Sequence, residues 1–334
     1  MLASRHHVTR EGLMRRLTPR LIQLSTSATL LALTGCGPTA GSGDDGGGGG
    51  DQVDADPASP DAGLFTPPPD GAQCQKMDVL FVIDNSGSMA QEQTNLAANF
   101  PGFISVLDAS GLDYRVAVTT SGRDYSYTMT TPIGPLPESQ DGGDNGRMLQ
   151  PASCGMSRRW IEKTDPDPAG TFACVAAVGT GGPSDEMPLA ATRDAFEDRI
   201  SDGHNAGFRR ADALLAIVIL TDENDCSYEQ SVSLPFGQFL CESMMEPVSN
   251  YVAFLDGYTG SRQRWATAVI AGAGPGDCTS ALGDADEATR LIDFVNQTGP
   301  NAVISSICEG DLSVGLAAAL DTFSSACATF PPIE

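Results

Sequence analysis

The sequence contains very little histidine, and this scarcity limits the catalytic chemistry open to the protein. Among its 334 residues only His6, His7 and His204 are histidines. The first two lie in an arginine-rich opening stretch, so a folded domain after it has His204 alone. A Ser-His-Asp arrangement or a zinc site of several histidines would depend on that one side chain. Its loop, Asp202-Gly-His-Asn, is more typical of a solvated histidine.

Basic residues are also few, and this bears on the partners that the protein can have. The chain has 19 lysines and arginines against 43 aspartates and glutamates, a net charge of −24. Such a surface repels phosphate backbones and anionic lipid headgroups, which argues against nucleic-acid binding. No phosphate-binding G-x-x-x-x-G-K-[ST] loop is present, and Asp277 replaces the third glycine of a dinucleotide loop at Gly272. No site for a small-molecule substrate is evident.

Long apolar runs are missing too, and the one near the start, Leu21 to Leu33, is short for a membrane span of roughly 20 residues. It follows several arginines and ends in Leu33-Thr-Gly-Cys36, which resembles a bacterial lipoprotein signal. The resemblance implies cleavage before Cys36, lipidation of that cysteine and a place in the cell envelope. Gly37 follows the cysteine, and the absence of aspartate at this position resembles lipoproteins that are sorted to the outer membrane. A plain secretory peptide or a short membrane helix is the alternative, and Met14 is a second candidate start.

The chain divides into three parts by composition. Residues 1–36 form the expected signal peptide. Residues 37–73 are mostly Gly, Asp, Pro, Ser and Ala, including the run Gly46 to Gly50, and predict a disordered acidic tether. Residues 74–330 hold the apolar patterns of one folded domain.

The most informative stretch is Met77 to Met89, MDVLFVIDNSGSM. Its unbroken run Val79 to Ile83 is typical of a strand buried on both faces of a parallel sheet. Asp84, Ser86 and Ser88 follow, where an open α/β sheet places its ligand crevice. One carboxylate and two hydroxyls suit Mg²⁺ or a similar hard cation.

Strands and helices alternate along the rest of the domain and predict a doubly wound, mostly parallel α/β sheet flanked by helices. After a helix over Leu96 to Leu107, a polar insertion from Ser121 to about Gly155 is too rich in Gly, Pro and Asp for the core. Asp311 is the expected N-cap of the last helix. The further expected strands are 114–120, 158–163, 211–220, 265–271 and 302–307, and the further helices are 171–178, 287–297 and one from 312 to about 323.

Asp84-x-Ser86-x-Ser88 after a buried strand resembles the metal-ion-dependent adhesion site of the von Willebrand factor type A domain, over about Cys74 to Cys327. The resemblance implies a Mg²⁺ site, or one for Mn²⁺ or Ca²⁺, with Asp222 as the ligand of a third loop. The middle loop, 179–186, lacks the usual threonine before a helix. Ser184 is the preferred ligand there, although it could simply be an N-cap, and Thr180 and Glu186 are alternatives. Glu223 and Asp225 are expected to form a solvated acidic loop.

Eight cysteines are left once Cys36 is assigned to lipid, and export favours four disulfides. Free thiols or a zinc site are weaker interpretations because C-x-x-C pairs are absent. The termini of the family's fold lie close together, which implies a Cys74–Cys327 bridge. Proximity along the chain suggests the other pairs, Cys154–Cys174, Cys226–Cys241 and Cys278–Cys308.

These features favour a surface-anchored binding protein whose metal accepts a carboxylate from a protein ligand, and not an enzyme. One alternative is a hydrolase or phosphotransferase that uses the cation as a Lewis acid. Another is a structural envelope component with a vestigial metal site.

Overall fold

The computed structural model describes residues 74–229, 231–281, 283–309 and 312–331. The expected signal peptide, the tether and Asp311 lie outside the described residues. No helix in the described part of the chain is long and apolar enough to cross a membrane.

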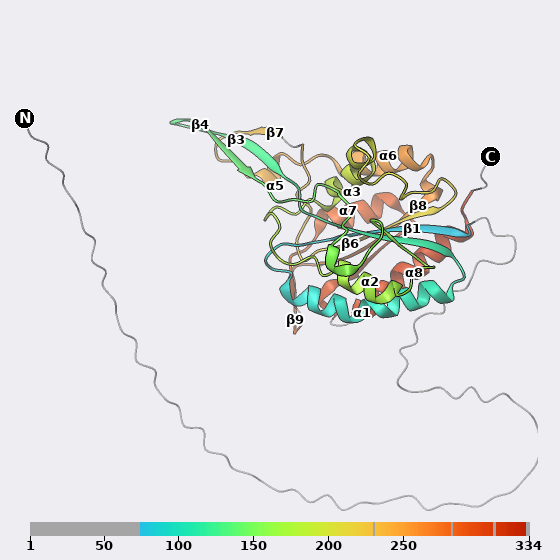
Figure 1. Ribbon diagram of the computed structural model, residues 1–334. Coiled ribbons are helices and arrows are strands. Elements are labelled where there is room, and N and C mark those ends of the chain that lie inside the picture. Colours follow the sequence, from blue (N-terminus) through green and yellow to red (C-terminus); the bar gives the residue numbers. More distant parts are fainter. Residues whose placement is uncertain (1–73, 230, 282, 310–311, 332–334) are drawn as a thin grey trace, which may run out of the picture. The chain divides into compact units, whose positions relative to one another are not determined.

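A six-stranded sheet forms the centre of the domain (Figure 1). Five of its strands are parallel, and only β5 at one edge pairs antiparallel. The two central runs, β1 and β6, are almost entirely apolar and buried, as strands covered on both faces must be. The strand order is β11 (Ala302–Ser306), β8 (Trp265–Ala271), β6 (Leu214–Leu220), β1 (Lys76–Ile83), β2 (Asp113–Thr120) and β5 (Ile161–Glu162).

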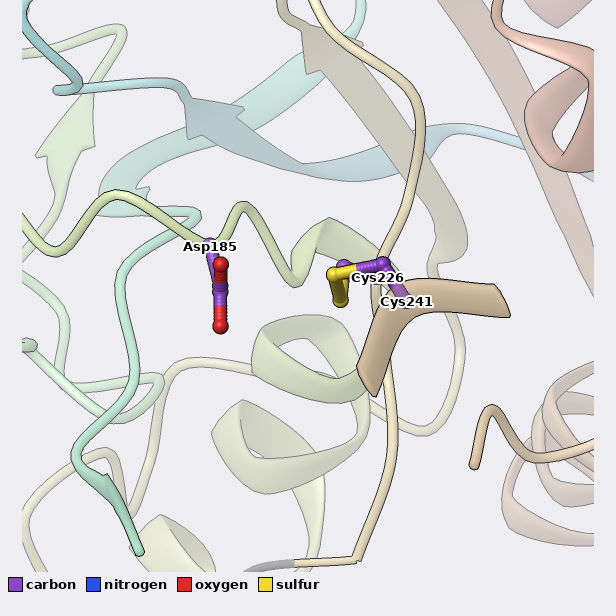
Figure 2. Close-up of side chains that lie close together, drawn as sticks. All are labelled: Asp185, Cys226 and Cys241. Atoms are coloured by element: carbon purple, nitrogen blue, oxygen red, sulfur yellow. A yellow bond between two sulfur atoms is a disulfide. The ribbon is translucent and has the colours of Figure 1, made fainter. Parts of the chain in front are cut away.

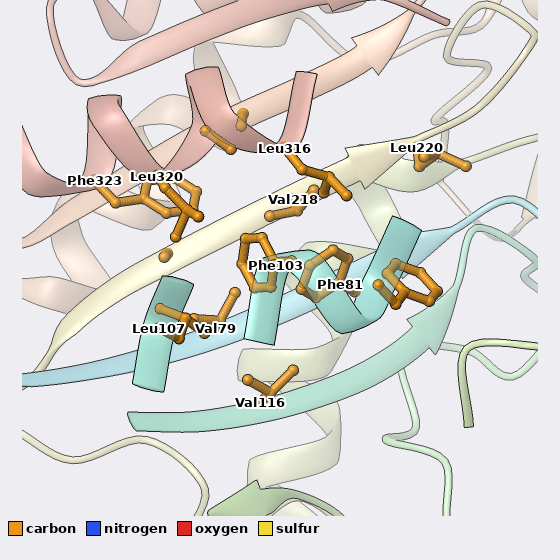
Figure 3. Close-up of a cluster of buried hydrophobic side chains, with 14 of the residues drawn as sticks. Val79, Phe81, Phe103, Leu107, Val116, Val218, Leu220, Leu316, Leu320 and Phe323 are labelled. Atoms are coloured by element: carbon orange, nitrogen blue, oxygen red, sulfur yellow. The ribbon is translucent and has the colours of Figure 1, made fainter. Parts of the chain in front are cut away.

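Three helices cover one face of the sheet. Phe81 of β1 packs there edge-on against Phe103 of α1, with ring centroids 5.2 Å apart, and Val218 of β6 lies beside Leu316 of α8 in the same apolar cluster (Figure 3). Burial of this many apolar side chains is the main favourable term in folding. The helices are α1 (Ala90–Ala109), α2 (Pro168–Val175) and α8 (Leu312–Ala328).

A second apolar cluster fills the opposite face. Because side chains alternate along a strand, Leu80 and Val82 of β1 point to this side. The covering helices are α3 (Pro188–Phe196), α6 (Val248–Thr259) and α7 (Thr289–Thr298), with the short α4 (Asp198–Ser201) and α5 (Leu240–Ser243) beside them. The expected mixed α/β fold with a mostly parallel sheet is therefore confirmed.

The expectation for residues 121–155 is wrong in part. Strands β3 (Tyr125–Thr131) and β4 (Gly134–Gln140) form a hairpin there, and β7 (Ser231–Leu234) joins β3 in a separate sheet. Arg123 is buried against Asp194, with Nε 2.6 Å from Oδ2, and Met148 is buried in the second cluster. The segment is polar overall, yet partners distant in sequence neutralise its charge and complete its sheet.

Several other elements differ from expectation. Of the strand expected over 158–163 only β5 forms. The sequence interpretation implied a helix directly after Ser184, whereas α3 begins only at Pro188. It did not identify α6, because a run of mixed polarity obscures the pattern of that helix. It also missed the small hairpin of β9 (Cys278–Ser280) and β10 (Gly283–Ala285).

Four disulfides staple the domain, and disulfide bonding is confirmed. The structure joins Cys74 to Cys327, Cys154 to Cys174, Cys226 to Cys241 and Cys278 to Cys308, the pairs expected above. The first connects the start of the domain to the last turns of α8, across a sequence separation of 253 residues.

We predict that the Cys74–Cys327 bridge contributes more to stability than the Cys154–Cys174 bridge. In the chain-entropy model, loops as different as 253 and 20 residues correspond to about 5.5 and about 3 kcal/mol. Denaturant unfolding of the Cys74→Ser/Cys327→Ser and Cys154→Ser/Cys174→Ser variants measures both losses. An equal or smaller loss for the first pair would contradict this order.

Candidate functional site

The carboxyl ends of β1 and β6 bring two acidic loops to one edge of the sheet. The strands are parallel neighbours in register, Ile83 opposite Leu220, so the residues that follow them lie side by side. Asp84 N donates to Leu220 O at 2.8 Å. The order of the strands also reverses at β1, since β2 lies on one side of it and β6 on the other. Open α/β sheets bind ligands at such a point.

Asp84 is fully buried, and both of its carboxylate oxygens are held. Its Oδ1 accepts from Ser86 N at 2.7 Å and its Oδ2 accepts from Thr221 Oγ1 at 2.6 Å. Burial raises the pKa of Asp84, and the hydrogen bonds from Thr221 and Ser86 oppose that rise. The Thr221 hydroxyl therefore links the β6 loop to the β1 loop.

The two serines lie at the mouth of the same site. Ser86 Oγ and Ser88 Oγ are 2.9 Å apart; Ser86 is buried and Ser88 is exposed. Two hydroxyl oxygens are thus presented together, one of them facing solvent. Hydroxyls of this kind are hard donors for Mg²⁺, Mn²⁺ or Ca²⁺.

Asp222 lies beside the serines, only 3% exposed, and its Oδ1 has no hydrogen-bond partner among the described residues. Burial raises the pKa of Asp222 to about 7, the nearby charge of Asp84 adds to the rise, and a hydrogen bond with Ser88 opposes it. A buried acceptor without a donor is costly.

The middle loop, 179–186, is attached to the first loop by specific hydrogen bonds. Gln93 Nε2 donates to Asp84 O at 2.9 Å and to Gly179 O at 2.6 Å. Gly182 N donates to Asn85 O at 2.8 Å. A Cβ on Gly182 would stand 2.3 Å from Asn85 Oδ1, so any larger residue here would displace the Asn85 side chain.

Within that loop it is Glu186, not Ser184, that joins the acidic residues. Glu186 is 2% exposed, and its Oε1 has no hydrogen-bond partner in the part of the chain that the structure describes. Burial raises the pKa of Glu186 well above the ordinary value, and Glu223 and Asp84 add to the effect. Ser184 is exposed and contacts Gln140 Oε1 of β4 at 3.2 Å. Thr180 is exposed as well. Ser184 is not an N-cap either, because α3 begins at Pro188 after Met187.

Glu92 is a fourth buried carboxylate that the sequence interpretation missed. It lies in the first turn of α1, is 3% exposed, has an unpartnered Oε2, and its charge raises the pKa of Asp222. Its spacing to Leu96, Phe100 and Phe103 places it on the apolar face of the helix. A carboxylate at an apolar position of the helical pattern is the sequence signal that could have revealed this residue.

The expectation that Glu223 and Asp225 are solvated is wrong. Asp225 is 1% exposed and lies 3.0 Å from Arg290 Nη2, so a buried ion pair neutralises it. It also accepts from Leu189 N at the start of α3. Glu223 is half-buried and hydrogen-bonds to Glu186.

No basic residue balances the acidic cluster, by which we mean Asp84, Glu92, Glu186, Asp222 and Glu223. Within residues 74–331, as far as the structure describes them, none of these five forms an ion pair with lysine or arginine. Buried carboxylates normally have a counter-charge. Oxygen donors with unpartnered atoms and no counter-charge fit a hard divalent cation.

A second group, Asp185 with Cys226 and Cys241, has ligand atoms within 4.8 Å of one another. Figure 2 shows that the two sulfur atoms are joined in a disulfide. Metals bind the cysteine thiolate, so an intact disulfide removes both sulfur ligands. This group is therefore a structural bridge beside an aspartate.

His204 takes no part in the acidic cluster. Its Nε2 lies 3.0 Å from Arg159 Nε and 3.3 Å from Met148 O, and burial lowers its pKa. The histidine is half-buried, where the sequence suggested a solvated one.

Comparison with known proteins identifies no family. No family model and no curated protein matches the chain. Solved structures with some similarity include proximal thread matrix protein 1 from the mussel byssus, at 11% identity and a TM-score of 0.40, covering 75% of this chain and 49% of that one. The pilus adhesin SpaC from Lactobacillus rhamnosus GG matches in its open conformation at 8% identity and a TM-score of 0.39, covering 76% and 30%.

This chain thus spans about half of the mussel protein and less than a third of the adhesin. At such TM-scores and identities the similarity establishes neither a family nor a function for this chain.

We predict that stability of the metal-free protein falls as pH rises from about 4 to 7. A carboxyl whose pKa is raised on folding binds its proton more tightly in the folded state, so stability is lost as it ionises. For Asp222, a rise from 3.8 to about 7 corresponds to about 4 kcal/mol. Asp222→Asn should remove this part of the pH dependence and be more stable than wild type at pH 7.

Denaturant unfolding in EDTA at several pH values measures the effect. Asp293→Asn, on the exposed side of α7, is the control, since it removes the same charge outside the cluster. A wild-type pH dependence in Asp222→Asn would contradict the assignment.

Proposed function

We propose that this chain is a von Willebrand factor type A-like binding protein that holds one divalent cation at the acidic cluster and, through it, a carboxylate of a protein ligand. The observation that carries the proposal is the buried Oδ1 of Asp222, which lies beside Ser88 and has neither a hydrogen-bond partner nor a basic neighbour in an ion pair among the residues that the structure describes. A cation supplies the missing positive charge. The doubly wound order of that family is part of the proposal, supported by the reversal of strand order at β1.

The residues have distinct roles in this proposal. Ser86, Ser88 and Asp222 hold the cation, and Glu186 contributes from the middle loop. Asp84 is fixed by Ser86 N and Thr221 Oγ1, so it orients the first loop and adds negative charge. Mg²⁺ is the first choice, with Mn²⁺ or Ca²⁺ as alternatives, because every donor is a hard oxygen.

Ligand access is through the exposed side of Ser88. Mg²⁺ keeps some of its waters when few side chains bind it, and an acidic group of a partner can displace one of them. Without the cation, the same partner carboxylate would meet the repulsion of the acidic cluster. Binding would therefore depend on the metal.

We favour binding over catalysis because the described residues place no histidine beside the acidic cluster to act as a base. A hydrolase or phosphotransferase would turn over phosphoester or peptide substrates in a metal-dependent way. A structural envelope component with a vestigial site would bind its partners equally well in EDTA.

We predict that Asp84→Ala weakens Mg²⁺ binding by about 10- to 100-fold, the cost of losing an outer-shell partner, and that Asp222→Asn, which removes a direct ligand, weakens it by more than about 100-fold. Isothermal titration calorimetry with MgCl₂ measures the affinity. Asp293→Asn should bind like wild type. Equal affinities in wild type and Asp222→Asn would exclude this site.

We predict that Glu186→Gln weakens Mg²⁺ binding whereas Ser184→Ala and Thr180→Val do not. Glu186 lies in the acidic cluster, while the other two side chains are exposed. The same titration distinguishes them. A loss of affinity in Ser184→Ala alone would return the middle-loop role to that serine.

We also propose that Cys36, outside the described residues, carries the lipid that anchors the protein in the cell envelope, at the outer membrane. Cys36→Ser should move the protein from the membrane fraction to the soluble fraction of a bacterial host that processes lipoproteins. Fractionation followed by immunoblotting measures the shift. Retention of Cys36→Ser in membranes would mean that a different anchor exists.

A further inference from the structure

The hairpin β3–β4 and strand β7 form a projecting sheet that extends away from the parallel sheet (Figure 1). Large apolar side chains are exposed at its far end and on the loop after β7. Their exposed fractions are 99% for Ile133, 47% for Leu136, 66% for Phe236 and 69% for Phe239. We call Ile133, Leu136 and Phe236 the distal apolar surface, because they lie at the end of the hairpin and just after β7, whereas Phe239 directly precedes α5. Exposed apolar residues gathered in one place, unlike single ones, mark interaction sites.

The distal apolar surface lies in a part of the chain without charge. Residues 125–137 and 230–241 contain no Asp, Glu, Lys or Arg, although the whole chain has a net charge of −24. The two segments meet in the projecting sheet, since Met129 of β3 lies opposite Leu136 of β4 and Leu234 of β7. Tertiary structure therefore combines two neutral segments, about 100 residues apart, into one neutral projection.

The turn at the end of the hairpin holds Ile133 outward. Thr131 Oγ1 donates to Gly134 O at 2.7 Å and accepts from Ile133 N at 3.3 Å. Pro132 and Pro135 flank the turn and restrict its backbone. The isoleucine is thus exposed by a fixed local structure, and its insertion into an apolar phase would need no rearrangement of this turn.

Polarity increases along the hairpin from its end to its base. Ile133 is at the end, Tyr127 lies further down, and Glu138, opposite Tyr127, is the first charged residue. Four residues separate Thr131 from Tyr127, or about 13 Å at the rise of a strand. Along the hairpin, an apolar end is followed by an aromatic phenol and then by a charged residue. Side chains that contact the interface of a bilayer occur in the same order.

We propose that the distal apolar surface inserts into the interfacial region of a zwitterionic lipid bilayer. Insertion at this depth, about 5–10 Å, is typical of interfacial anchors, and the uncharged part of the hairpin is long enough for it. Anionic bilayers are disfavoured by the negative charge of the domain. Only the end enters, because the edges of the sheet carry backbone groups that need water or protein partners.

Pairing of β4 with a strand of a second copy is a poorer explanation of the surface. Pro135 and Pro137 lack the N–H group that an added strand would need, and proline on an edge strand prevents such pairing. The acidic charge of each copy would also oppose association.

The test uses the full chain in EDTA, so that it does not depend on the proposed metal site. Flotation with phosphatidylcholine vesicles measures the partition coefficient of wild type, Ile133→Asp and Val314→Asp. Val314 is 54% exposed on α8, so its variant adds the same charge to another exposed apolar position. We expect Ile133→Asp to lower partitioning by about tenfold or more, the value of burying one aliphatic side chain, and Val314→Asp to have little effect.

A fluorescent probe reports the position of the end of the hairpin directly. In Ile133→Trp, emission should shift to the blue on addition of vesicles and be quenched by brominated lipid chains, whereas Val314→Trp should show neither change. All variants carry Cys36→Ser, so that the lipid proposed on this cysteine cannot mask the contact of the hairpin, and they otherwise keep residues 1–73 unchanged. Partitioning unchanged in Ile133→Asp, or an unshifted Ile133→Trp spectrum, would overturn the proposal. Loss of a protein contact in Ile133→Asp with vesicle binding intact would also overturn it, and assign the surface to a protein partner.

Discussion

The hydrogen bond from the Thr221 hydroxyl to the buried carboxylate of Asp84 connects the ends of the two central strands, and the site depends on it. It orients Asp84, which in turn accepts from Ser86 N and so shapes the first loop. Gln93 then links that loop to residues 179–186 by bonding Asp84 O and Gly179 O. The parallel register of β1 and β6 makes these bonds possible, since it brings both strand ends to one level.

Gathering acidic side chains at this edge costs stability, and the remainder of the domain offsets that cost. Among the described residues Asp84, Glu186 and Asp222 are buried together without a basic partner, whereas Asp225, three residues after Asp222, is neutralised by Arg290. The contrast separates a structural carboxylate from those suited to a ligand. Apolar clusters on both faces of the sheet and four disulfides hold the scaffold that keeps the acids in place.

The domain has two surfaces of different chemistry. The acidic cluster concentrates negative charge and suits a cation, while the projecting sheet is neutral and ends in exposed apolar side chains. Both surfaces are built from segments that leave the same edge of the parallel sheet, because β3 follows β2 and β7 follows the loop after β6. Ser184 of the middle loop hydrogen-bonds to Gln140 of β4 and so connects the loop of the acidic cluster to the projecting sheet. The proposed metal-dependent partner and the proposed bilayer contact would therefore use different parts of one domain.

The sequence by itself determined the parts that depend on local pattern. The apolar runs of β1 and β6 predict buried strands, and the spacing of Asp84, Ser86 and Ser88 predicts donors at a strand end, because these signals lie within a few consecutive residues. Tertiary structure decided the rest. Glu186 instead of Ser184, the ion pair of Asp225, and the pairing of β3 with β7 each depend on which distant segment is packed alongside. Burial and counter-charge are properties of that packing, and the local sequence does not contain them.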